Sequence, residues 1–186
     1  MNDWIAVAIV AAGLVALIGL LWLWRRSRRR STVETALAAI AVERLRDVLV
    51  PDGMGGEIHV EHLLLTTRGI LVINVKPYEG VIFASDRMDQ WTVMGSTGRS
   101  GFPNPIGSLY DRVAAVRQLI REIDVAGYVV FPSKADFSKG RPADVRLPED
   151  LLQVYGKDEP GERGPQVDAL IPHWEKLRDA VRPAAS

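Results

Sequence analysis

The 186-residue chain has no cysteine, few aromatic residues and no net charge. Without cysteine it can form no disulfide, no thiolate nucleophile and no cysteine-ligated zinc or iron–sulfur site. Its three histidines, His59, His62 and His173, are too dispersed for a histidine-rich metal site. His59 and His62 are three residues apart, which places them on opposite faces of a regular strand. We therefore interpret each histidine as a satisfied or exposed side chain.

The zero net charge hides an uneven distribution. Five arginines occur between residues 25 and 30, and after residue 30 there are 18 basic and 22 acidic residues, a balance of −4. A mildly acidic domain lacks the broad basic surface that drives nonspecific DNA binding. The charge therefore argues against a general DNA-binding module, but less against a small site with local positive charge.

Long apolar runs are absent except for one, from Trp4 to Trp24. These 21 residues would span about 30 Å as a helix, the thickness of the hydrocarbon core of a bilayer. Tryptophans at its two ends and arginines directly after it are typical of a membrane helix whose following domain is cytoplasmic. A cleavable signal peptide is the alternative, but the positive charge follows the run and no Ala-x-Ala site is present. The sequence predicts a single-pass anchor in the inner or plasma membrane.

The most informative stretch is 58–83. It predicts two strands, Ile58 to Leu65 and Ile70 to Lys76, joined by a turn at Gly69, and a third strand, Val81 to Phe83. Polar residues interrupt these strands. Asn74 and Lys76 share one face, and Glu61 lies within reach if the strands pair.

A carboxylate, an amide oxygen and an ammonium at a sheet edge could hold a divalent metal and a phosphate. The alternative is an ordinary strand end with an exposed lysine.

The same stretch resembles the NERD (nuclease-related) domain, a branch of the restriction-endonuclease-like superfamily. The likeness covers roughly residues 33–150. The matching residues are His62, Gly69, Lys76, Gly80, Ile82, Trp91-Thr92, Phe102-Pro103-Asn104-Pro105 and Tyr128 to Phe131.

The resemblance implies a nuclease site, with departures. In the superfamily two acids hold magnesium and a lysine positions or activates the attacking water. This implies Glu61 as a metal ligand where the family carries aspartate, Asn74 at the position of the second acid, and Lys76 as the water-positioning group. Glu34 is a further candidate ligand, with helix capping as the alternative. The missing carboxylate at Asn74 removes a charge interaction worth at most about 4 kcal/mol at ~4 Å, which weakens metal binding.

The remaining pattern predicts an α/β fold with a mixed sheet flanked by helices, and the resemblance implies that this sheet is restriction-endonuclease-like. We expect three parts: a transmembrane anchor with its arginine run (1–30), a nuclease-related domain (31–156), and a linker with a C-terminal amphipathic helix (157–186). The expected elements are a helix from Ser31 to about Val48, a strand from Asp89 to Met94, a flexible loop over 95–101, a helix from Asn104 (N-cap) to about Asp124, a strand from Gly127 to Pro132, an edge strand from Val145 to Leu147, a short helix from Pro148, and a helix from Val167 to Val181.

Three functions are compatible with these features. The first is a membrane-tethered, magnesium-dependent phosphodiesterase acting on DNA or RNA. The second is a nucleic-acid-binding or regulatory module that has lost turnover, as Asn74 suggests. The third is a membrane-anchored scaffold that does not bind nucleic acid. None of these requires a small-molecule cofactor.

Overall fold

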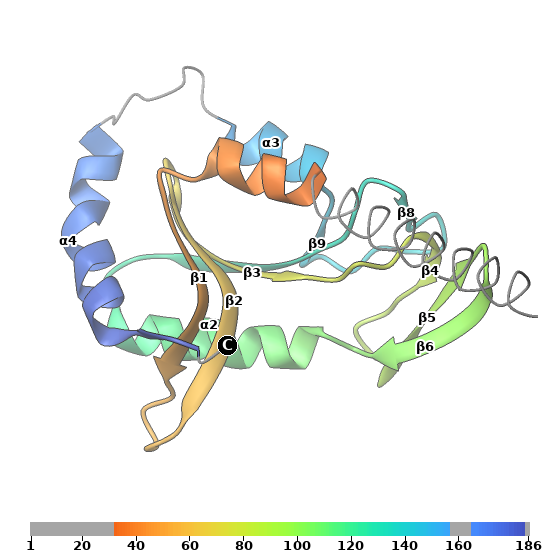
Figure 1. Cartoon of the computed structure of the whole chain (residues 1–186), viewed down its shortest axis with the longest axis horizontal. Helices are drawn as coiled ribbons and strands as arrows, with labels where there is room; N and C mark the ends of the chain where they lie inside the picture. Colours follow the sequence, from red (N-terminus) through yellow and green to blue (C-terminus); the bar gives the residue numbers. More distant parts are fainter. Residues whose placement is uncertain (1–31, 157–164, 185–186) are drawn as a thin grey trace, which may run out of the picture.

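The computed structural model describes residues 32–156 and 165–184. It contains a six-stranded sheet with the order β10-β1-β2-β3-β7-β9 and a four-stranded sheet with the order β6-β5-β4-β8 (Figure 1). In this part of the chain no helix is long and apolar enough to cross a membrane. The predicted anchor at 4–24 and the linker at 157–164 lie outside the described residues, so both stay predictions.

The six-stranded sheet is mixed, as predicted. Strands β1 (Glu43–Pro51), β2 (Glu57–Thr66) and β3 (Gly69–Val75) pair antiparallel in sequence order. Strand β7 (Val125–Val130) pairs in parallel with β3, and β9 (Val145–Arg146) pairs in parallel with β7. At the other edge, β10 (Arg182–Pro183) pairs antiparallel with β1. Gly69 closes the predicted β2–β3 turn with φ 134°, a conformation that costs other residues energy.

Helices cover both faces of this sheet (Figure 1). One face packs against the helix over 32–40 and α3 (Pro148–Tyr155), through Leu37, Leu64, Leu71 and Leu151. The other face packs against α2 (Ile106–Leu119) and α4 (Pro165–Ala180), and it holds the larger core. Along β3 the side chains alternate between these two cores, because Val72 belongs to the α2 core and Leu71 and Ile73 belong to the other.

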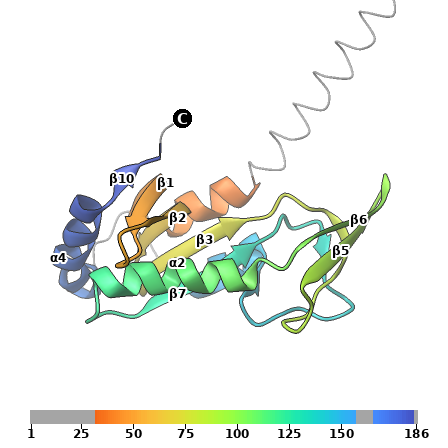
Figure 2. The same cartoon turned by 90° about the horizontal axis from the view of Figure 1, so that it is seen from below.

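The four-stranded sheet extends from the end of the molecule opposite α4 (Figure 2). It contains β4 (Gly80–Phe83), β5 (Gln90–Gly95), β6 (Gly98–Pro103) and β8 (Ala135–Asp136). An aromatic cluster joins it to the main core: the ring centroid of Phe131, directly after β7, lies 6.4 Å from that of Trp91 and 6.3 Å from that of Phe102. The predicted third strand is therefore real, but it belongs to this second sheet.

Several of the predicted elements differ from the structure. The first helix ends at residue 40, and the segment predicted as its second half forms β1. Segment 95–101, predicted as a flexible loop, is the tip of the β5–β6 hairpin and most of β6. Helix α2 ends at Leu119 rather than near Asp124. Pro105 rather than Asn104 is its N-cap, although Asn104 Oδ1 still accepts a hydrogen bond from the Ile106 N–H at 3.0 Å.

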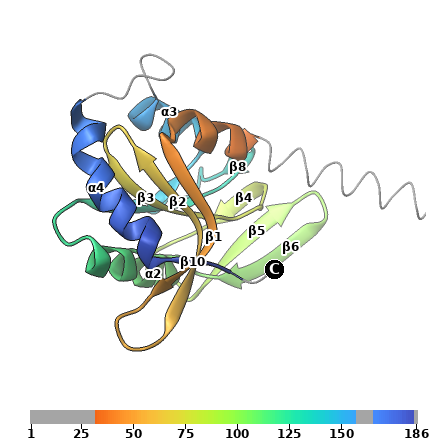
Figure 3. The same ribbon diagram turned by 60° about the vertical axis from the view of Figure 1, so that its left-hand side comes forward.

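The C-terminal helix, which the amphipathic pattern predicted, packs on the domain. Val167, Trp174 and Leu177 of α4 are buried in the α2 core. The Trp174 Nε1–H donates to Glu43 Oε2 at 2.7 Å, and β10 lies beside β1 (Figure 3). The end of the described chain thus completes the main sheet.

Candidate functional site

Strands β2 and β3 separate at the open end of their hairpin, far from the turn, and the side chain of Glu61 fills the gap. Their pairing reaches His62 and Ile73 and then stops. Beyond it, the Val75 N–H donates to Glu61 Oε2 at 2.8 Å. The Glu61 carboxylate therefore accepts the hydrogen bond that a regular ladder would give to a carbonyl. This arrangement fixes one carboxylate oxygen at the carboxyl end of β3.

Asn74 lies beside this carboxylate. Its Nδ2 is 3.5 Å from Glu61 Oε2, and the residue is 8% exposed. Asn74 Oδ1 is buried and has no hydrogen-bond partner within the described structure. Since buried acceptors are nearly always satisfied, an unpaired one in a polar site is a position where a donor or a cation would be favourable.

Lys76 completes the group. Alternation along β3 places Asn74 and Lys76 on the face that carries Val72, the side of the sheet covered by α2. Burial lowers the pKa of Lys76, and the nearby Glu61 carboxylate opposes that shift. Burial likewise raises the pKa of Glu61, while its hydrogen bond from Val75 and the charge of Lys76 lower it. The structure thus brings together the three residues predicted to form the site.

Strand β1, the neighbour of β2 in the sheet, is distorted opposite Glu61. β1 and β2 pair on both sides of Asp47 and Glu61, at Arg46 with His62 and at Val48 with Val60, but not at these two residues. Asp47 has φ 50°, the one positive φ outside glycine in the described chain. Positive φ in a non-glycine residue costs about 1–2 kcal/mol and is frequent at functional sites. The sequence gives no indication of this distortion.

A cavity of about 240 Å³ opens beside Glu61. It lies between β1, β2, the end of β3 and the helix over 32–40, and three carboxylates reach it. Its lining residues are Val33, Glu34, Arg46, Asp47, Glu61, His62, Val75 and Pro77. Asp47 was not among the predicted site residues.

Glu34, the further candidate ligand, is held by two arginines. Its oxygens lie 2.8 Å from Arg44 NH2 and 3.1 Å from Arg46 NH2. These ion pairs compete with a metal for the carboxylate. Glu34 therefore shares the cavity wall with Glu61, but its carboxylate is paired with arginines and Asn74 does not line this cavity.

His62 is buried beneath this wall, contrary to the interpretation of each histidine as satisfied or exposed. Its Nε2 lies 3.5 Å from Glu34 Oε1 and 3.9 Å from Glu61 Oε1, whereas its Nδ1 has no partner in the described structure. Burial lowers the pKa of His62 to about 4 despite the nearby carboxylate of Glu34. The ring is consequently neutral near pH 7, and these contacts are not ion pairs there.

The residues present fit a magnesium ion with few protein ligands. Within the described residues, no group of three or more His, Cys, Asp or Glu side chains is arranged to hold a metal. Magnesium often uses only one or two carboxylates and keeps several waters. The Glu61 carboxylate is an oxygen donor of this kind, and Asn74 Oδ1 would join it once the amide, which now turns its Nδ2 toward Glu61, is rotated. The carboxylate that the superfamily would place at 74 is replaced by a neutral oxygen.

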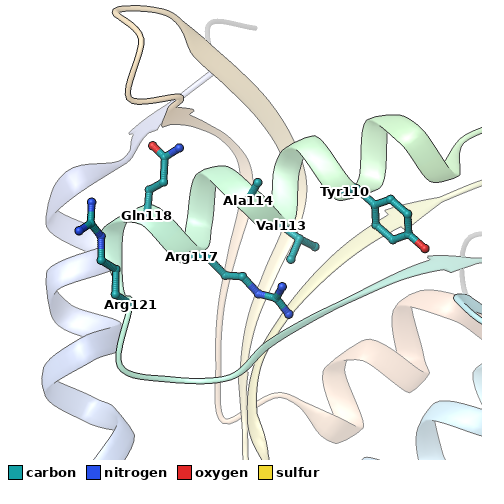
Figure 4. A pocket seen from close by; sticks show the side chains of 6 residues that line it. All are labelled: Tyr110, Val113, Ala114, Arg117, Gln118 and Arg121. Atoms are coloured by element: carbon teal, nitrogen blue, oxygen red, sulfur yellow. The ribbon is translucent and has the colours of Figure 1, made fainter.

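A second hollow lies along α2, and Figure 4 shows the side chains that line it. It measures about 400 Å³ and is lined by Tyr110, Val113, Ala114, Arg117, Gln118 and Arg121. The Arg117 NH2 donates to the carbonyl of Val125 at 2.7 Å, which ties α2 to β7. This lining contains no carboxylate, so it does not offer a metal site.

Comparison with known proteins connects this geometry to a family. Residues 31–132 match the sequence profile of the nuclease-related domain (NERD). A protein of Bacillus anthracis described as uncharacterised is 30% identical over 78 residues, which are 42% of this chain and 37% of that protein. The chain therefore covers well under half the length of this relative. No solved structure matches.

Proposed function

This chain belongs to the nuclease-related domain family, and from that premise we propose that it hydrolyses phosphodiester bonds of DNA or RNA with magnesium. The observation that carries the proposal is the meeting of Glu61, Asn74 and Lys76 at the carboxyl end of β3. Open α/β sheets bind their ligands outside the carboxyl ends of parallel strands, and β3 pairs in parallel with β7. Family membership and the helix-flanked mixed sheet support a restriction-endonuclease-like fold.

The proposed roles follow from the atoms available. Glu61 and Asn74 Oδ1 would hold magnesium, with waters completing the shell. Magnesium at this position would neutralise charge on the phosphoryl oxygens and favour ionisation of a bound water. Lys76 would orient the attacking water or contact a phosphoryl oxygen through its ammonium. The hydrogen bond from Val75 keeps Glu61 in place while the phosphate is bound.

The apolar run and the arginines after it support a further proposal on location. Residues 4–24 would cross the inner or plasma membrane once, with residues 31–186 in the cytoplasm. The nucleic acid would then be processed next to the bilayer.

A binding or regulatory module without turnover is the second candidate function. One observation favours it: Glu61 Oε2 is already committed to Val75, and the side chain beside it is a neutral amide. A site of this composition can retain a phosphate through Lys76 while binding magnesium too weakly for hydrolysis.

The test is a cleavage assay of the full chain on single- and double-stranded DNA and RNA with magnesium or manganese. We expect Lys76→Ala to lower the cleavage rate by about 100-fold or more, because positioned proton-transfer groups contribute that much. Lys176→Ala, at an exposed lysine of α4, is the matched control and should cleave like the wild type. Asn74→Glu should lower the magnesium concentration needed for half-maximal activity.

The outcomes separate the candidates. Cleavage that survives Lys76→Ala rejects this site. If the wild type binds but does not cleave nucleic acid, and Asn74→Glu cleaves, the binding module is the correct function. If neither protein binds or cleaves, the domain is a scaffold.

A further inference from the structure

A cation from α2 reaches the start of β2, close to the site. Arg112 Nε donates to the carbonyl of His59 at 2.7 Å, and its NH1 donates to the carbonyl of Ser108 at 2.6 Å. His59 precedes Glu61 by two residues on β2. The two carbonyls therefore hold the guanidinium at the end of the sheet where β2 begins and β3 ends.

Among the described residues, no acid forms an ion pair with this guanidinium. Other arginines pair with acids, for example Arg141 with Asp150 and Arg182 with Glu57. Arg112 has only neutral carbonyl partners within the described part of the chain. Guanidinium carries five N–H donors, so three remain for a ligand. A fixed fork of donors with an uncompensated charge matches a phosphate.

Arg112 and Lys76 form a local pair of cations at one end of the sheet. Arg112 contacts β2 at His59, two residues before Glu61. It comes from the helix that covers the face of the sheet on which Lys76 lies, so both cations are on the same side of the sheet. Lys76 in turn interacts with Glu61. Two neighbouring cations repel, and an anion between or beside them relieves that repulsion. In a mildly acidic domain such a local cationic pair is a specific feature rather than part of a general basic surface.

We propose that Arg112 binds a backbone phosphate adjacent to the phosphodiester that lies at Glu61, Asn74 and Lys76. This inference rests on the proposed function, and it assigns the strand of nucleic acid a path from the end of β3 toward the first half of α2. The alternative is that Arg112 serves only as a brace between α2 and β2.

The experiment measures binding of the full chain to a fluorescein-labelled DNA oligonucleotide, single-stranded and duplex, over a range of salt concentrations with a chelator present to prevent cleavage. Each phosphate contact contributes about 0.7 to the slope of log K against log salt for single strands, and about 0.9 for duplex. We expect Arg112→Ala to reduce the slope by that amount and to weaken binding about tenfold. Arg112→Lys should keep most of the slope, because it keeps the charge.

Arg117→Ala is the matched control (Figure 4). Arg117 belongs to the same helix and also donates to a strand carbonyl, that of Val125, but it lies on the other hollow. It should leave the slope unchanged. The melting temperature of both variants is measured in parallel, because a brace would lower it without altering the slope.

The results distinguish this inference from the proposed function. If the wild type binds DNA and Arg112→Ala keeps the wild-type slope, Arg112 is only a brace and the inference is wrong, while the function stands. A slope reduced equally by Arg117→Ala also overturns it, because the effect would then be that of total charge. If the wild type does not bind any oligonucleotide, the proposed function fails and this inference fails with it.

Discussion

At the scale of single residues, a buried neutral histidine beside two carboxylates makes stability depend on pH. His62 is 3% exposed, and burial lowers its pKa to about 4 from an ordinary value near 6.5. In the unfolded chain the same ring binds a proton as the pH falls below about 6.5, whereas in the folded chain it does so only near 4. Between these values the unfolded state binds more protons, so acid favours unfolding.

We therefore expect the free energy of unfolding to fall by about 3 kcal/mol through His62 as the pH decreases from about 6.5 to about 4. The measurement is urea unfolding at a series of pH values in chelator, for the wild type and for His62→Gln. The difference between the two proteins should depend on pH within this window and be constant above it. The same substitution at the exposed His59 is the control. A wild-type and variant difference that is constant from pH 7 to pH 4 would contradict a neutral buried ring.

The residues of the site were predictable only where a local pattern determines their position. Alternation along one strand places Asn74 and Lys76 on one face, and the turn at Gly69 brings Glu61 to them. Arg112 could not be found in this way, because it meets His59 across 53 residues of sequence. Asp47 was not predicted for another reason. A positive φ at aspartate does not change the composition of the neighbouring sequence. The role of each residue in catalysis stays a prediction.

At the scale of elements, the first helix was predicted too long because a strand imitated its spacing. Val42, Leu45 and Val48 recur every three residues, which is typical of a helix. All three pack in the α2 core, although Leu45 and Val48 lie on one β-strand. The distortion at Asp47 breaks the alternation, so that two residues three apart face the same core. An interrupted strand thus produced a helical period.

The hairpin of β5 and β6 was missed for the opposite reason. Five of the six residues of β6 are exposed, so no apolar alternation marks it as a strand. Its pairing comes from the backbone and from the two-residue connection between Gly95 and Gly98. Glycine-rich hairpins of this kind have the composition of a loop.

The packing of α2 on β7 depends on one glycine. A Cβ at Gly127 would lie 2.4 Å from Val113 Cγ2 and 3.2 Å from Leu109 Cδ1. Because valine is short and branched, it cannot move aside without a shift of the helix. Gly127→Ala should therefore lower the free energy of unfolding by about 1–3 kcal/mol. Gly107 lies on α2 with open space around it, so Gly107→Ala should leave the free energy of unfolding unchanged or raise it by at most about 1 kcal/mol.

Chemical denaturation of the two variants checks this prediction. Val113→Ala combined with Gly127→Ala should recover part of the loss, because it removes the obstructing methyl group. Equal stability of Gly127→Ala and the wild type would mean that α2 can move away from β7 at no cost.

At the scale of the whole molecule, the folded unit is larger than the segment that the family profile covers. The profile ends at residue 132, yet α4 and β10 come later in the chain and close one end of the main sheet. The sequence predicts 157–186 as a third part, made of a charged linker and an amphipathic helix. It could identify the apolar face of α4 but not the surface that receives it, because that surface is formed by β1 and α2, which come much earlier in the chain.

Trp174 tests whether α4 is part of the core. It is 1% exposed and joins the C-terminal helix to the beginning of β1 through Glu43. Trp174→Ala should lower the free energy of unfolding by about 3–5 kcal/mol, because it removes a large buried side chain and leaves a cavity. Trp174→Phe, which keeps most of the packing and loses the Nε1–H donor, should cost about 1–2 kcal/mol. Glu175→Ala, at an exposed position on the same helix, should stay within about 0.5 kcal/mol of the wild type.

Urea unfolding followed by circular dichroism gives the three values together with the dependence on denaturant. If α4 belongs to the cooperative unit, all variants unfold in one transition and only the midpoint moves. An appendage would behave differently: Trp174→Ala would detach α4 alone, leaving a main transition with the wild-type midpoint. That result would favour a separate C-terminal part after residue 156. A single displaced transition instead requires any nuclease assay to include the C-terminal helix, because the sheet that carries Glu61, Asn74 and Lys76 is then stable only with α4 in place.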